Sequence, residues 1–140
     1  MLVTVILGLL ALDVLVIFHE FGHLLAARFF GVTVEAFSVG MGPVLLHKTA
    51  FGIDWRLSLL PIGGYCAMKG EKDYQKALEA ELPRIEAELD SFYGIHPLKR
   101  FAIALAGPAA NLLFAVIASA AVAMAGYTYY SYSARIRVGT

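Results

Sequence analysis

The sequence contains few charged residues and only one cysteine. Of its 140 residues, 16% are charged and 59% are apolar, whereas an ordinary globular chain is about a quarter charged and about half apolar. The formal net charge is zero, so the charge balance gives no reason to expect nucleic acid as a partner. The single cysteine, Cys66, excludes an internal disulfide and is best explained as a small apolar residue. The composition therefore excludes an ordinary soluble domain and indicates membrane spans.

Most of the hydrophobic residues lie in two long runs. The first extends from Leu2 to about Ala27, and Asp13 is the one charged residue in its first 18 positions. The second, residues 101–126, contains no charged residue. A helix of 26 residues is ~39 Å long and can cross a hydrocarbon core of ~30 Å. We therefore expect a membrane α-helical fold with two transmembrane helices, at residues 2–30 and 101–126.

The first run differs from a secretory signal peptide, which is the competing interpretation. No basic residue precedes it, and no small-residue cleavage site ends it. The second run contains Gly107 and Pro108 about one third of the way along. We expect a kink or local unwinding of the helix at that point.

The segment between the runs divides into a glycine-rich part and a charged part. In residues 34–68, apolar and polar residues alternate, which is typical of strands. The polar stretch at residues 47–52 would form the turn of a β-hairpin. Residues 71–92 repeat apolar side chains every three or four positions and predict an amphipathic helix, which Pro83 should break or kink. Such a helix could lie on the membrane surface, pack on a partner, or simply be solvated.

Lysine and arginine are distributed unevenly around the two runs. None precedes the first run, nine lie in residues 28–100, and two follow the second run. Because basic residues in short loops stay on the cytoplasmic side, we expect the middle segment to be cytoplasmic and both ends to be outside.

The stretch FHEFGHLL, residues 18–25, places three ionisable side chains inside the first run. In a helix, His19 and His23 are one turn apart, ~6 Å along the axis, and project from the same face. Two neutral imidazoles at this spacing can hold one zinc ion. Glu20 lies ~100° around the helix, so it could take a proton from a water molecule at the metal without binding the metal itself.

The alternative is a purely structural polar cluster between helices. Each ionisable group costs at least ~2.5 kcal/mol at the centre of a bilayer, so three of them within five residues favour a functional site. Gly22, beside the histidines, would keep the helix surface flat for a partner backbone. The depth of His19 along the first run would place the site in the cytoplasmic half of the bilayer, and water would need a cavity to reach the site.

Two other acidic residues are candidates for metal ligands. Asp13 lies six residues before His19, about 120° away around the helix and ~9 Å along it, so we reject it. Asp54 in the expected hairpin is conceivable but unsupported. Asn111, an isolated amide in the second run, could be a hydrogen-bonding contact between helices.

Four motifs occur in order: HEFGH in the first run, GMG and then PIGGY between the runs, and GPAAN in the second run. In this combination the chain resembles the site-2 proteases over residues 1–126, and most closely the regulator-of-sigma-E-type proteases of bacteria. The resemblance implies an intramembrane zinc metalloendopeptidase, a multi-pass protein of the bacterial inner membrane. It also implies substrates that are single-span membrane proteins, such as anti-sigma factors, cut during regulated intramembrane proteolysis.

The resemblance also assigns roles to individual residues. His19 and His23 would be zinc ligands, and Glu20 would be the base that activates water. Residues 34–68 would be a membrane-reentrant β-hairpin that pairs with the substrate as an added strand. Asn111 would face the catalytic centre and position the substrate. Four glycines of the hairpin would bring the backbone close to the substrate or serve turn geometry alone; they are Gly40, Gly42, Gly63 and Gly64.

The sequence departs from the family pattern in one respect. The family's third zinc ligand is an aspartate in an L-D-G motif on a later span, and this sequence contains no such motif. We therefore expect an N-terminal portion of a longer protease, with residues 127–140 beginning an extracytoplasmic region. A non-catalytic membrane scaffold is the alternative. A metal transporter is less well supported, because Asn111 and Ser119 are the only polar side chains in residues 101–126.

Overall fold

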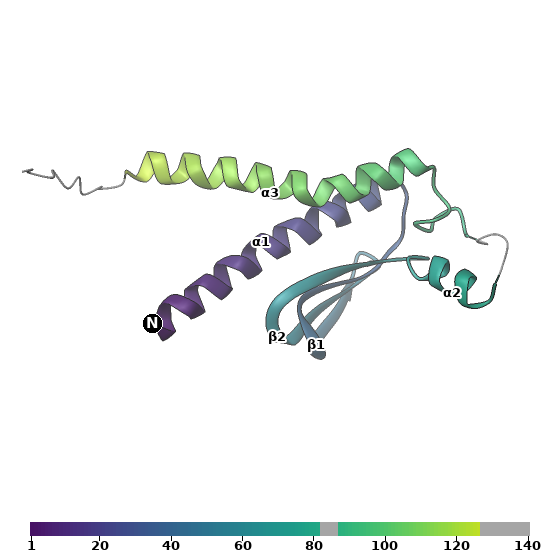
Figure 1. Ribbon diagram of the computed structural model, residues 1–140, viewed down its shortest axis with the longest axis horizontal. Helices are drawn as coiled ribbons and strands as arrows, with labels where there is room; N and C mark the ends of the chain where they lie inside the picture. Colours follow the sequence, from purple (N-terminus) through teal and green to yellow (C-terminus); the bar gives the residue numbers. More distant parts are fainter. Residues whose placement is uncertain (82–86, 127–140) are drawn as a thin grey trace, which may run out of the picture.

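The computed structural model describes residues 1–81 and 87–126. Its elements follow the order α1 (Leu2–Phe29), β1 (Val34–Ala50), β2 (Ile53–Met68), α2 (Asp73–Glu79) and α3 (Pro97–Ala125). The two long helices cross, the two strands form a sheet beside α1, and α2 lies at the far end of that sheet (Figure 1). Residues 127–140, expected to begin an extracytoplasmic region, and Pro83 lie outside the described residues.

Helices α1 and α3 confirm the two long apolar helices predicted from the sequence. Both are long and apolar enough to cross a membrane. At the start of α3, the His96 ring accepts a hydrogen bond from the Leu98 N–H at 3.3 Å, and Pro97 occupies the first turn, where its missing N–H is not needed. The helix continues through Gly107 and Pro108, so the local unwinding expected there is not seen.

The two helices pack closely at Gly22 of α1. A Cβ atom at this position would lie 2.8 Å from the Cβ of Ala110 and against the carbonyl oxygen of Ala106. Only glycine fits between the two backbones without a shift of one helix. The expectation that Gly22 leaves room for a partner backbone is confirmed.

Strands β1 and β2 confirm the predicted hairpin. They are joined by Phe51 and Gly52, both with positive φ (54° and 75°), as expected for a two-residue hairpin turn of the primed type. The turn lies within the polar stretch predicted for it. Arg28, at the end of α1, donates a hydrogen bond to the carbonyl oxygen of Phe51 at 3.1 Å, so the turn comes back to the end of α1.

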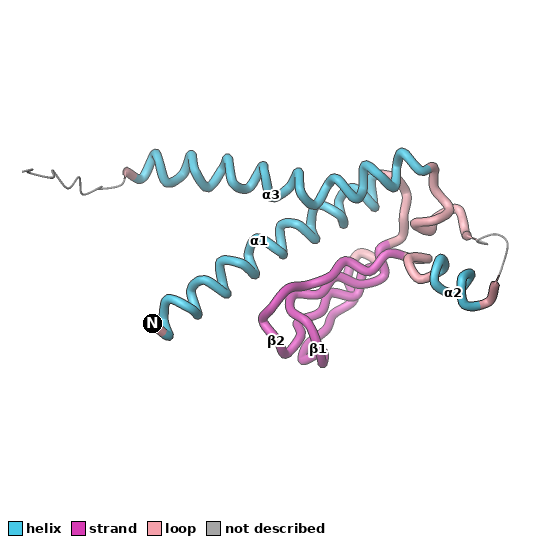
Figure 2. The backbone as a smooth tube through the Cα atoms, viewed as in Figure 1, coloured by secondary structure: helices cyan, strands magenta, loops and turns pink. Residues whose placement is uncertain are grey.

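Each strand is itself folded in two, which the sequence reasoning did not foresee. Residues 36–39 pair with residues 64–67 on one side and with residues 54–57 on the other. Figure 2 shows the resulting curled sheet in magenta. The bends contain glycines with φ between 81° and 86°, namely Gly40, Gly42 and Gly63. The bends of the two strands pack on one another, because a Cβ at Gly40 would lie 2.6 Å from the carbonyl oxygen of Leu60.

One face of the hairpin joins the C-terminal half of α1 and the start of α3 in a small core. Its buried members are Leu24, Ala27, Val32, Val34, Phe37, Ile53, Cys66 and Ile103. Burial raises the pKa of the Cys66 thiol to about 12, as expected for a structural cysteine. In contrast, large apolar side chains are exposed along both long helices and at the bends of the hairpin.

Among the described residues, the amphipathic helix predicted over residues 71–92 is confirmed at 73–79 and is wrong at 80–81 and 87–92. Helix α2 covers only Asp73–Glu79, and Glu81 has a φ of 51° that ends it. Residues 89–95 form turns and bends instead.

Hydrogen bonds to the base of the hairpin explain this difference. The N–H of Thr33 donates to the Asp90 carbonyl oxygen at 2.9 Å, and the N–H of Phe92 donates to that of Lys69 at 2.8 Å. The Lys69 ammonium donates to the Asp90 carboxylate at 2.9 Å and lowers the pKa of that carboxyl group. These contacts, made across the chain, override the local helical periodicity.

Candidate metal centre

His19 and His23 on α1 converge on one point beside Gly107 of α3. A Cβ atom at Gly107 would lie 2.6 Å from Nε2 of His19 and 2.5 Å from Nε2 of His23. The ring centroids are 4.8 Å apart and the rings meet edge to face, at 82°. Glycine therefore keeps open a small space that both Nε2 atoms border, which is the arrangement that two ligands of one ion require.

The orientation of His23 is set by α3. Its Nδ1 lies 2.8 Å from the carbonyl oxygen of Ile103. A carbonyl oxygen can only accept a hydrogen bond, so Nδ1 carries the proton and Nε2 keeps a free lone pair. Metal-binding histidines usually donate their other ring N–H in this way.

Asn111 is the partner of His19. Its amide nitrogen lies 3.3 Å from Nδ1 of His19, while its buried Oδ1 has no hydrogen-bond partner within the described residues. The two ends of an amide have nearly the same shape. Turning the amide over lets Oδ1 accept the Nδ1–H of His19, which satisfies the orphaned oxygen and gives His19 the same tautomer as His23. Asn111 thus faces the candidate centre and contacts a candidate ligand, while its role in positioning the substrate stays a prediction.

Glu20 faces the hairpin. Its Oε2 accepts a hydrogen bond from the backbone N–H of Cys66 at 3.1 Å. Gly64 also lies close, because a Cβ there would be 3.9 Å from Cγ of Glu20 and 2.6 Å from the carbonyl oxygen of Ser38. Residues 64–66 of β2 therefore pass beside this carboxylate. Of the two glycines predicted to position substrate, Gly64 lies beside Glu20, whereas the N–H of Gly63 contacts Asp13.

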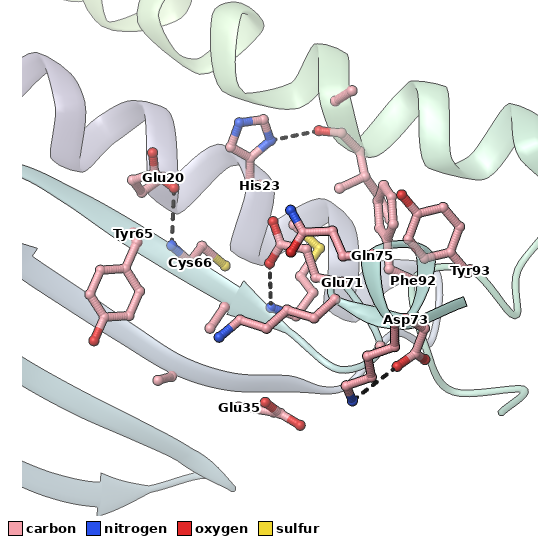
Figure 3. Close-up of a pocket in the computed structure, with 18 of the residues that line it drawn as sticks. Glu20, His23, Glu35, Tyr65, Cys66, Glu71, Asp73, Gln75, Phe92 and Tyr93 are labelled. Carbon is pink, nitrogen blue, oxygen red and sulfur yellow. Dashed lines mark hydrogen bonds and ion pairs between the residues drawn. The ribbon is translucent and has the colours of Figure 1, made fainter. Parts of the chain in front are cut away.

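An open cavity of about 1140 Å³ reaches both Glu20 and His23. Its walls come from α1, the hairpin, the α2 region and the start of α3, and many of its side chains are charged or polar (Figure 3). Such a cavity is required if water is to reach ionisable groups within an apolar helix. The cavity expected from the sequence is present.

The two other acidic residues have partners of their own. Asp54 accepts from Arg56 at 2.7 Å, and His47 lies 3.1 Å from its other oxygen. The Arg56 hydrogen bond lowers the pKa of Asp54. Asp13 Oδ1 accepts from the N–H of Gly63 at 2.9 Å. Within residues 1–81 and 87–126, no group of three or more His, Cys, Asp or Glu side chains could hold a metal ion, so the described chain offers two ligands.

Sequence reasoning missed the contributions of Gly107 and Ile103. The sequence predicts helix distortion at Gly107 and includes it in the GPAAN motif, but assigns it no role beside the histidines. Its spacing of four residues from Asn111 places both on one face of α3 and could have signalled its role. Ile103 contributes only a carbonyl group, for which no side-chain signal exists.

Comparison with known sequences shows which proteins this chain is similar to. The model of Peptidase family M50 matches residues 7–136. Two relatives that share the name "Putative zinc metalloprotease" come from Treponema pallidum and Borreliella burgdorferi. They are 47% and 40% identical to this chain, over 96% of it in both cases. Protease RseP of Yersinia pestis is 41% identical over 79% of the chain. The chain spans 30%, 31% and 23% of these relatives' lengths, respectively.

Proposed function

Because the chain belongs to peptidase family M50, whose members include site-2 proteases, we propose that it forms the zinc-binding part of an intramembrane metalloendopeptidase. The observation that carries the proposal is the convergence of two Nε2 atoms, from His19 and His23, on the space beside Gly107. The names of the relatives support zinc as the metal.

His19 and His23 would hold the zinc ion, together with a third ligand from outside the described residues. The donor set fits, because both Nε2 atoms border one small space and each Nδ1 has a partner on α3. When bound, zinc polarises a peptide carbonyl and lowers the pKa of water toward ~7. The resemblance to site-2 proteases makes an aspartate the expected third ligand.

Glu20 would act as the general base and acid. Its carboxylate takes a proton from the attacking water and returns it to the nitrogen of the leaving amine, so that the peptide C–N bond breaks. The hydrogen bond from Cys66 orients this carboxylate, and the cavity beside it supplies water. General acid–base catalysis by such a group contributes ~10²–10⁴-fold to the rate.

The substrate would bind as an extended strand on the hairpin. Residues 64–67 pair on one side with residues 36–39 and lie beside Glu20, so an added strand here would present its peptide bonds to the carboxylate. The bends expose Met41, Leu60 and Ile62, which suits insertion of this end of the hairpin into lipid. We propose single-span membrane proteins, such as anti-sigma factors, as substrates.

The proposed location is the bacterial inner membrane, with the hairpin on the cytoplasmic side. Two helices of sufficient length support membrane insertion, and the distribution of basic residues supports the orientation. The non-catalytic scaffold has no specific observation in its favour, because it does not explain why two imidazoles converge beside a glycine.

Substitution of Glu20 tests this function. In the full-length protease reconstituted in vesicles, Glu20→Gln should lower cleavage of a single-span substrate by at least ~100-fold and keep zinc bound. Cleavage at the wild-type rate in this variant would remove Glu20 from the mechanism. His19→Ala and His23→Ala should lose both zinc and cleavage, whereas a scaffold would contain no stoichiometric zinc in any variant.

A further inference from the structure

Asp13 is an acidic residue near the middle of an apolar helix and is not part of the HEFGH motif. A carboxyl group at this depth is costly and is functional by default. The structure gives it a partner on another element, because Oδ1 accepts the backbone N–H of Gly63 at 2.9 Å. Gly63 belongs to the second bend of the hairpin and has a φ of 81°.

Glu20 makes the same kind of contact further along α1, where it accepts the N–H of Cys66 at 3.1 Å. Asp13 and Glu20 are seven residues apart, which places them within ~20° of one another around the helix and ~10.5 Å apart along it. Gly63 and Cys66 are three residues apart, or ~10 Å in an extended strand. The matching spacings mean that β2 runs alongside α1 and is held at both ends of this segment.

Gly63 is suited to this contact by its backbone conformation. In a regular strand, the N–H groups of residues three apart point to opposite sides. The positive φ of Gly63 breaks that alternation, so its N–H can face α1 on the same side as that of Cys66. In an apolar environment this N–H would otherwise lack a partner, which is strongly unfavourable.

We propose that Asp13 is a positioning residue that fixes the bend at Gly63 to α1 and so holds residues 64–66 of β2 beside Glu20. The fixed edge is the one on which an extended substrate would pair. This consequence for catalysis rests on the proposed function. The docking of the hairpin on α1 does not, and it can be measured without any substrate or metal.

The reactivity of the Cys66 thiol measures this docking, because the residue is only 6% exposed in the docked hairpin. It is also the only cysteine in the sequence. In the full-length protein in detergent, the rate of Cys66 alkylation by N-ethylmaleimide would be followed by mass spectrometry of its peptide. Asp13→Leu removes the acceptor and should raise this rate about tenfold, equivalent to ~1.4 kcal/mol of docking free energy. Asp13→Asn keeps an acceptor oxygen in the same place and should react at nearly the wild-type rate.

Val14→Leu is the matched control, because Val14 is the next residue of α1 and its side chain is exposed. It should leave the alkylation rate unchanged. A wild-type rate in Asp13→Leu would overturn the proposal. So would an equally raised rate in Asp13→Asn, because loss of the charge alone would then explain the effect.

Zinc content and kinetics separate positioning from general loss of structure. In Asp13→Leu, zinc per protein should stay at the wild-type value, while KM for a single-span substrate rises more than kcat falls. Loss of zinc together with fast alkylation would indicate unfolding and would also contradict the positioning role. If Glu20→Gln left cleavage intact but Asp13→Leu still exposed Cys66, the proposed function would fail while the docking role would stand.

Discussion

The two long helices contribute different kinds of chemical groups to the candidate site. Helix α1 carries the ionisable side chains of the site, His19, Glu20 and His23, and also Asp13. Helix α3 has no charged residue after Arg100 and contributes a glycine, a backbone carbonyl group and one amide. Every one of these α3 groups lies against a histidine of α1.

This difference shows how polar chemistry can be accommodated in an apolar surrounding. Buried polar groups need partners, because water cannot replace a missing hydrogen bond there. Helix α3 supplies partners that bring no further charge. Helix α3 is therefore as specific to the site as α1, and changes on α3 should disturb the metal centre even though none of its residues would bind the ion.

The substitution with the largest expected effect is Gly107→Ala. The added methyl group would lie within 2.6 Å of both Nε2 atoms and would fill the space proposed for the metal. Zinc affinity should fall by at least ~100-fold, beyond what changes in outer contacts usually cost. Titration with a competing chelator would measure this in the full-length protein.

Gly8→Ala is the control for this experiment. It makes the same change in α1, where a Cβ would meet no described atom within 4 Å. It should leave zinc affinity unchanged. Stoichiometric, tightly bound zinc in Gly107→Ala would show that the two histidines do not share an ion at this position.

An intermediate effect is expected for Asn111→Leu. The leucine cannot hydrogen-bond Nδ1 of His19, so the ring loses the contact that fixes its orientation. Losses of such outer contacts typically cost 10–100-fold in metal affinity, about the range expected here. Asn111→Asp keeps an oxygen that can accept from Nδ1–H and should bind zinc more tightly than the leucine variant.

Ser119→Leu controls for the general effect of an apolar substitution in α3, because Ser119 is exposed and lies two turns beyond Asn111. It should bind zinc as the wild type does. Equal affinities in Asn111→Leu and the wild type would return Asn111 to the alternative of a contact between helices that is unrelated to the metal.

Much of the fold could be predicted because its signals are local. The apolar runs predicted both helices, and the alternation of residues 34–68 predicted the hairpin with nearly the observed bounds. The fold of each strand onto itself depends on pairing between segments far apart in sequence, which alternation does not encode. The prediction of a long helix in the α2 region was wrong for the same reason, because hydrogen bonds with Thr33 and Lys69 override the periodicity of the sequence.

The candidate site also has one part that the sequence predicts and another that it does not. His19, Glu20 and His23 fall in one turn of helix, so a short motif was enough to propose them. Their partners on α3 are 80 and 92 residues away in the sequence, and one of those partners is a backbone carbonyl group. The hydrogen bond between Asp13 and Gly63 joins residues that are 50 positions apart, so the sequence could not predict it. An isolated acid in an apolar run did indicate that Asp13 needed a partner.

The smallest effect on zinc is expected for Gly22→Ala, which disturbs the contact between the helices and leaves the site residues in place. Its Cβ would lie 2.8 Å from the Cβ of Ala110 and against the Ala106 backbone, so α1 and α3 must separate slightly. Overpacking of this kind costs ~1–3 kcal/mol of stability, measurable by unfolding in mixed detergent micelles. Zinc affinity should fall by less than about tenfold, the ratio equivalent to ~1.4 kcal/mol, because the histidines and their partners can shift together. A loss of zinc as large as that of Gly107→Ala would mean that the distance between the helices, and not the open space at Gly107, determines whether the metal binds.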